Sequence, residues 1–73
     1  MGQKWNECRI LCCDAVTLAQ TLPKGLKGRP RCYLDGACLE LHVKVPSRPH
    51  PKRDMFRTWC TEQGVPISMV EGL

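Results

Sequence analysis

The sequence has few aromatic residues and no long apolar run. Phenylalanine, tryptophan and tyrosine together make up 5% of its 73 residues. No stretch approaches the roughly 18 apolar residues that a membrane-spanning helix needs. The opening MGQKWNEC also lacks the apolar segment of a secretory leader. We therefore expect a protein that does not enter a membrane and that works in the cytoplasm.

Motifs that mark enzymes and nucleotide-binding proteins are also missing. The chain has no GxxxxGK[ST] phosphate loop and no pair of closely placed acids. Cys60 with His50, or Cys38 with His42, supplies the residue types that a thiol nucleophile needs. However, His42 follows Cys38 by four residues on one strand face, about 13 Å away at strand rise. The sequence predicts a protein that is not an enzyme and carries no cofactor.

Six cysteines and two histidines raise the question of a zinc site. The candidate ligands are Cys32, Cys38, His42 and Cys60. No C-x2-C pair occurs, although structural zinc sites usually take their ligands in such close pairs. We therefore expect no metal site. A disulfide framework is the alternative use of the cysteines, but without an export signal we expect reduced thiols that pack as small hydrophobic side chains.

The length predicts one small domain over residues 1–73, with a flexible N-terminus of about residues 1–6. At this size folding removes only about 60% of the chain's surface from water, so stability should lie near the lower end of ~5–15 kcal/mol. The 42% hydrophobic and 25% charged content is ordinary for a globular domain. A net charge of +4 suits an acidic partner, either nucleic acid or an acidic protein surface.

Residues 31–45, RCYLDGACLELHVKV, carry the strongest structural signal, that of a β-hairpin. Asp35-Gly36 between apolar runs is typical of a two-residue type I′ turn. That turn places Cys32 opposite Leu39, so that Cys32 and Cys38 lie on opposite faces. Alternation then gives one apolar face, formed by Cys32, Leu34, Ala37, Leu39, Leu41, Val43 and Val45. The other face carries Tyr33, Cys38, Glu40, His42 and Lys44.

Residues 7–22 show helical periodicity, with an apolar stripe at three- and four-residue spacing. The stripe is formed by Cys8, Leu11, Cys12, Ala15, Ala19 and Leu22. A rival interpretation makes residues 7–13 a strand and starts the helix at Asp14 as its N-cap. Residues 15–22 are helical in both. Residues 23–31 then read as a mobile basic connector rich in glycine and proline.

The second half of the chain predicts another helix over residues 52–63, ended by Gly64. Phe56 and Trp59 lie on its apolar face and are the expected core anchors. Residues 65–70 predict an edge strand, because Pro66 cannot donate a ladder hydrogen bond. The prediction is an α+β fold in which two helices pack on a three-stranded, mainly antiparallel sheet, in the order αββαβ.

Cationic side chains form two clusters in the sequence, residues 24–31 and 44–57. The predicted hairpin brings both clusters to its open end, beside Tyr33 and Trp5. The predicted partner-binding residues are Lys4, Trp5, Arg9, Lys24, Lys27, Arg29, Arg31, Tyr33, Lys44, Arg48, Lys52, Arg53 and Arg57. A solvated, charged surface is the alternative interpretation of the same residues.

The chain resembles small phage-encoded regulators that bind host RNA polymerase, such as the type found in a Xanthomonas phage. The resemblance lies in its size, its basicity, the αββαβ plan and the cysteine-rich segment with Cys8, Cys12 and Cys13. The resemblance implies a monomeric, non-enzymatic protein in the bacterial cytoplasm that inhibits transcription initiation or acts as an antiterminator. It also implies that Lys4, Trp5 and Arg9 contact the polymerase. A small nucleic-acid-binding module, with or without zinc, is the alternative.

Overall fold

The computed structural model describes residues 4–12, 14–32 and 38–73, except for the side chains of residues 38 and 39. Four strands form one sheet in the order β2-β3-β1-β4, and each neighbouring pair is antiparallel. In chain order the elements are β1 (Trp5–Leu11), α1 (Ala15–Gln20), β2 (Gly28–Cys32), β3 (Cys38–Pro46), α2 (Pro51–Glu62), the 3-10 helix η1 (Ile67–Met69) and β4 (Val70–Glu71).

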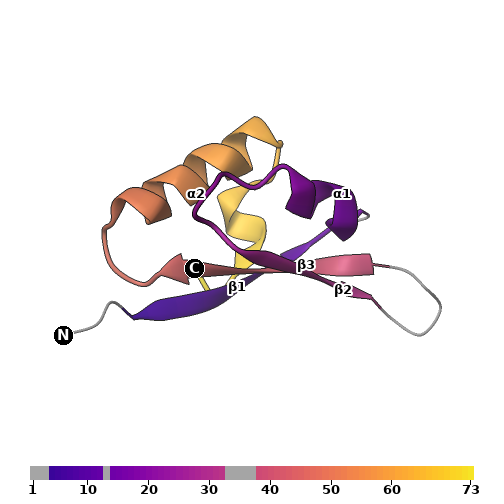
Figure 1. The fold of residues 1–73 in the computed structure, drawn as a ribbon, viewed down its shortest axis with the longest axis horizontal. Helices are drawn as coiled ribbons and strands as arrows, with labels where there is room; N and C mark the ends of the chain where they lie inside the picture. Colours follow the sequence, from indigo (N-terminus) through magenta and orange to yellow (C-terminus); the bar gives the residue numbers. More distant parts are fainter. Residues whose placement is uncertain (1–3, 13, 33–37) are drawn as a thin grey trace.

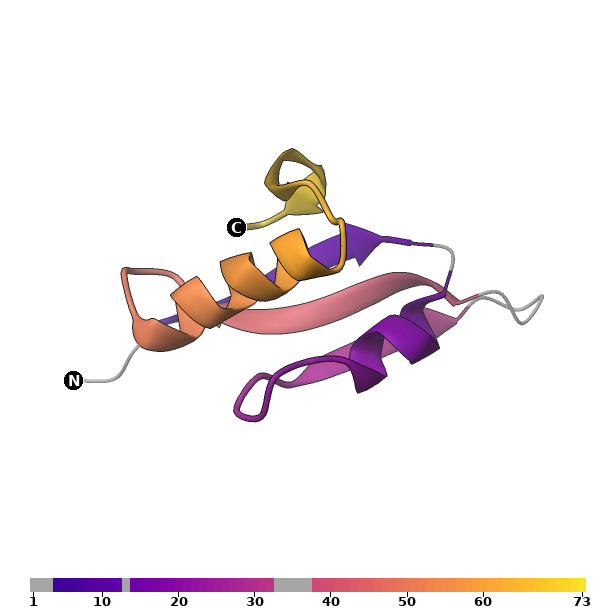
Figure 2. The ribbon, with the colours of Figure 1, turned by 90° about the horizontal axis from the view of Figure 1, so that it is seen from above.

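The connectivity βαββαβ with this strand order is the split βαβ, or ferredoxin-like, arrangement. Both helices lie on the same side of the sheet, with α1 over β2 and β3 and α2 over β3 (Figures 1 and 2). Among the residues that the structure describes, no helix lies on the other side of the sheet (Figure 1). The predicted α+β class and antiparallel sheet are confirmed. The predicted three strands and the order αββαβ are wrong, because the described chain adds β1.

The N-terminal segment is the strand of the rival interpretation. Cys8 and Ile10 are buried, whereas Glu7 and Arg9, which alternate with them, are exposed. This alternation is the two-residue period of a half-buried strand. The helical stripe from Cys8 was misleading because cysteine and isoleucine fit either period. Since β1 starts at Trp5, the predicted flexible terminus overlaps an ordered strand at its last two residues.

The core lies between the sheet and the two helices. Leu41, Val43 and Val45 of β3 are fully buried, which confirms these three members of the predicted apolar face. Cys32, which was predicted on the same face, is exposed, so its placement in the core is wrong. Phe56 is fully buried and its ring centroid lies 5.8 Å from that of Trp59. The Trp59 indole N–H donates to Thr21 Oγ1 at 2.9 Å. Both predicted core anchors are confirmed.

Local sequence signals set the ends of both helices. The Asp14 carboxylate accepts a hydrogen bond from the Thr17 backbone N–H at 3.2 Å and so caps α1. At α2, His50 Nδ1 accepts from the Lys52 N–H at 3.0 Å. After α2 the chain turns at Gly64, whose φ is 73°, as the sequence predicted. Helix α2 agrees with its predicted span to within one residue at each end. Helix α1 matches the part common to both interpretations, residues 15–22, to within two residues, whereas the predicted helical start at residue 7 is wrong.

The hairpin register is confirmed over part of its length. Arg29 lies opposite His42 and Arg31 opposite Glu40, as the predicted turn requires. A register shift after Arg31 then places Cys32 opposite Cys38, not opposite Leu39. The predicted pairing of Cys32 with Leu39 is therefore wrong. The predicted Asp35-Gly36 turn lies outside the described residues.

Strand β2 begins earlier than predicted, so Gly28–Cys32 is a strand where the sequence predicted the end of a mobile connector. Pro30 is tolerated within it because β2 is an edge strand of the sheet. At the other edge the predicted strand over residues 65–70 is mostly η1, and only Val70–Glu71 pairs, with β1. In the part of the chain described, no helix is both long and apolar enough to cross a bilayer.

Candidate binding surface

The helix-free side of the sheet, here called the open face, carries the side chains that alternate with the buried ones. Lys44 of β3 is exposed next to buried Val43 and Val45. Because side chains alternate along a strand, the open face is formed by every second residue of β1, β2 and β3. Its charged members are Glu7, Arg9, Lys27, Arg29, Arg31, Glu40, His42 and Lys44. The surface is therefore polar and mixed in charge.

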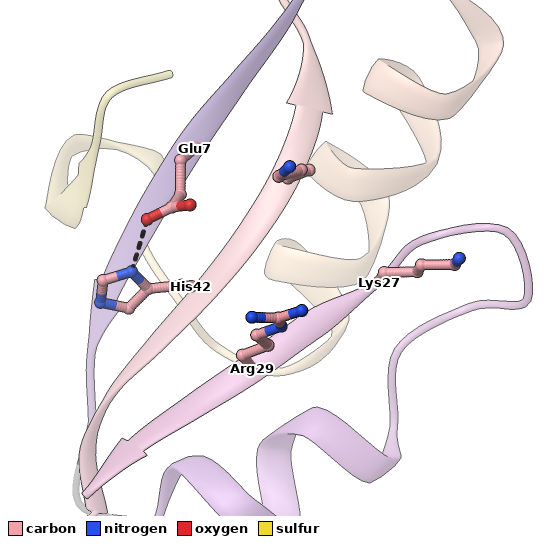
Figure 3. A pocket seen from close by; sticks show the side chains of 5 residues that line it. Glu7, Lys27, Arg29 and His42 are labelled. Carbon is pink, nitrogen blue, oxygen red and sulfur yellow. Dashed lines mark hydrogen bonds and ion pairs between the residues drawn. The ribbon is translucent and has the colours of Figure 1, made fainter.

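His42 is held at the centre of the open face by two carboxylates. Its Nδ1 lies 2.8 Å from Glu7 Oε1, and its Nε2 lies 3.1 Å from Glu40 Oε1 (Figure 3 shows the Glu7 contact). The hydrogen bond to His42 lowers the pKa of the Glu7 carboxyl, and the charges of His42, Lys44 and Arg29 act in the same direction.

The Glu7–His42 contact gives a prediction for the pH titration of Glu7. In the native protein the Glu7 carboxyl should titrate below its ordinary value of 4.5. The contact therefore stabilises the fold above that pH, and its contribution is lost as the pH falls through the native pKa. In His42→Leu the Glu7 midpoint should rise toward the ordinary value, because the hydrogen bond is gone. Carboxyl NMR titration measures both midpoints, and identical midpoints would contradict the assignment.

Three adjoining hollows run along the open face and its β2 edge. The middle hollow, of about 360 Å³, is lined by Glu7, Lys27, Arg29, His42 and Lys44 (Figure 3). A second hollow shares Lys27 and Lys44 with it and is completed by Trp5, Gly25 and Lys52. The third shares Arg29, His42 and Glu7 with the middle one and adds Pro30 and Arg31. Together they form one continuous depression.

Five cations line this depression, and we call them the basic strip: Lys27, Arg29, Arg31, Lys44 and Lys52. None of the five forms an ion pair with any residue that the structure describes. Glu7 lines the middle hollow with three of these cations, and its carboxylate is already bonded to His42. The strip therefore presents cationic groups that form no ion pair with a described carboxylate.

The structure gathers five of the predicted partner-binding residues, together with Trp5, and leaves the others elsewhere. Arg9 pairs with Glu71 at 2.8 Å, between β1 and β4. The Arg53 guanidinium donates to the Pro46 carbonyl at 3.0 Å. Tyr33 lies outside the described residues. The remaining predicted contacts are exposed but line none of the three hollows: Lys4, Lys24, Arg48 and Arg57.

The predicted convergence of both cationic clusters at the open end of the hairpin is only partly realised. Arg31 lies opposite Glu40, toward the turn, and not beside Lys44. The cations therefore follow β2 along its length. The sequence interpretation missed Glu7 and its bond to His42, because residues 7–13 also fit a helical period. The alternation of Glu7, Cys8, Arg9 and Ile10 was the signal that could have revealed them.

The cysteines supply no reactive site that the described residues reveal. Cys60 is fully buried, and its burial, together with the neighbouring Cys8, raises the pKa of its thiol to about 11. Its thiolate is therefore scarce at neutral pH, which makes it a poor nucleophile. Cys8, Cys12 and Cys60 are not disulfide-bonded. Cys32 is disulfide-bonded, and its partner is none of these three, so the expectation of six reduced thiols is wrong for Cys32.

Metal ligands are not clustered in the described part of the chain. No group of three or more histidine, cysteine, aspartate or glutamate side chains there could hold a metal ion.

Comparison with known proteins finds no family model, no curated protein and no solved structure that matches this chain. Its function is therefore inferred from the residues of the open face.

Proposed function

We propose that this protein is a non-enzymatic regulatory protein that binds an acidic macromolecule along the basic strip. The observation that carries the proposal is the set of five cations around three adjoining hollows, with no ion-pair partner among the described residues. Surface charges placed only for solubility are usually interspersed with the opposite sign. Here the acids of the open face are engaged with His42 or Arg9 instead.

The resemblance to phage-encoded regulators suggests one identity for the acidic partner, bacterial RNA polymerase. Under it the protein would work as a monomer in the bacterial cytoplasm. Binding would inhibit initiation at promoters or promote readthrough of terminators. The basic strip suits an acidic patch on such a partner, because complementary charge steers association and fixes orientation.

The alternative partner is nucleic acid itself, and the exposed indole of Trp5 beside the strip favours it. Trp5 is 43% exposed and lines the same hollow as Lys27, Lys44 and Lys52. Aromatic side chains beside a cationic groove are the usual arrangement for binding unpaired bases.

Direct binding measurements at two salt concentrations test the proposal. Purified bacterial RNA polymerase, single-stranded DNA and single-stranded RNA would each be titrated at about 50 mM and about 200 mM salt. We expect at least one of them to bind, and its affinity to fall steeply between the two concentrations as counterions compete for the strip. Failure of all three to bind at the lower salt concentration, or binding that does not respond to salt, would overturn the proposal.

A further inference from the structure

We infer that the hollow beside Trp5 is a subsite for an unpaired base, and that the acidic partner is a single-stranded nucleic acid whose phosphates follow the basic strip. The inference rests on the proposed function and names the partner class for the same surface. It is carried by the placement of one exposed aromatic ring at the end of a continuous row of cations.

Trp5 is positioned by residues at the start of α2. Lys52 Nζ lies 5.5 Å from the centroid of the indole ring, and the His50 ring lies 6.4 Å away at an angle of 54°. These contacts fix the ring where β1 begins, although 43% of the residue stays exposed. An indole that is held in place yet open to solvent can stack on a base without first being ordered.

Three lysines converge on the hollow that Trp5 lines. Lys27 comes from the segment before β2, Lys44 from β3 and Lys52 from α2. Gly25 also lines this hollow and has no side chain to fill it. Its φ is 101°, a conformation that suits glycine. A Cβ at Gly25 would come within 3.4 Å of Lys52 Cε. The lysine stem therefore lies against bare backbone, and its ammonium group reaches the same hollow as the indole.

The path away from this subsite is linear. Lys27 and Lys44 belong also to the middle hollow, and Arg29 connects that hollow to the one that contains Arg31. Arg29 and Arg31 are alternate residues of β2, and Lys27 stands two residues before Arg29, so the three positions span about 13 Å at the usual strand rise. Evenly spaced cations along a line match the evenly spaced charges of a nucleic-acid backbone.

The chemistry of the strip favours nucleic acid over a protein partner. Lysine is depleted in protein–protein interfaces, whereas it is a principal contact to phosphates. A single strand is favoured over a duplex because a paired base cannot stack on Trp5. The open face also has no helix that could enter a groove (Figure 1). Phosphate and base stacking are common to DNA and RNA, so both are included in the test.

Fluorescence anisotropy with labelled ten-nucleotide oligo(dT) and oligo(U) tests the inference. Trp5→Ala should weaken binding by roughly 5- to 150-fold through the loss of one stacked base, with an unchanged salt dependence. Trp5→Phe should restore most of the lost affinity, because a smaller aromatic face remains. Thermal unfolding of each variant shows that the fold is kept, and Trp59 fluorescence reports on the core independently of Trp5.

Each other outcome is decisive. Equal affinity of Trp5→Ala and the native protein, or tighter binding of a duplex of the same length, would overturn the base subsite. If purified RNA polymerase binds in a salt-dependent manner and neither oligonucleotide does, the inference fails and the proposed function stands. If none of them binds, both fail.

Discussion

Replacing Phe56 with alanine is expected to remove most of the protein's free energy of unfolding. The side chain is fully buried between α2 and the sheet, and its ring packs 5.8 Å from that of Trp59. Truncation of a buried phenylalanine to alanine costs ~3–5 kcal/mol through reduced burial and the cavity left behind. A domain of this size has little more stability than that. Circular dichroism with urea titration would measure the loss.

Met55→Ala is the matched control for Phe56→Ala. Met55 lies next to Phe56 on α2 but is 37% exposed, so its truncation creates no enclosed cavity. We expect Met55→Ala to unfold cooperatively with a much smaller loss of stability than Phe56→Ala. If Phe56→Ala stays within about 1 kcal/mol of the native protein, the packing of α2 described here is incorrect.

The double variant Lys27→Ala/Lys44→Ala is expected to lose most of the binding to the acidic partner at physiological salt. The two side chains line both the middle hollow and the hollow at Trp5, so their removal affects the strip at its centre. Removing a lysine that neutralises one phosphate should also reduce the slope of log affinity against log salt by about 1. The slope should therefore fall by about 2 in the double variant, which titrations at several salt concentrations would measure.

Arg48→Ala/Arg57→Ala is the matched control, because it changes the net charge of +4 by the same amount. Both arginines are exposed, and neither lines one of the three hollows. We expect this variant to bind nearly as well as the native protein and with nearly the same salt slope. Equal losses in the two double variants would mean that net charge, and not the strip, governs binding.

The sequence predicted most of the second half of the fold, because its signals there are local and consistent. Pro51 and Gly64 mark the two ends of α2, and Phe56 and Trp59 fall on one helical face. In the N-terminal third the signals conflict. Cys8 and Ile10 fit both a helix and a strand, and pairing of β1 with both β3 and β4 decides between them. Such pairing is non-local, so no window of the sequence contains it.

The sequence predicted which residues form the candidate site better than it predicted how they are arranged. Charge counting found Lys27, Arg29, Lys44 and Lys52, because clusters of cations are visible in any sequence. It could not place them on one face, since that depends on β2 beginning at Gly28 and on the register between β2 and β3. The bond between Glu7 and His42 joins residues 35 positions apart, and only the sheet brings them together.

The central claim is that the open face, and not the helical side, meets an acidic macromolecule. Amide chemical shifts during titration of the labelled protein with a ten-nucleotide oligo(dT) test it most directly. We expect the largest changes at the backbone amides of Arg29, Arg31 and Lys44 and at the indole N–H of Trp5, with small changes along α1 and along α2 beyond its first turn, which carries Lys52. Changes confined to the two helices, while the amides of β2 and β3 stay in place, would contradict the claim.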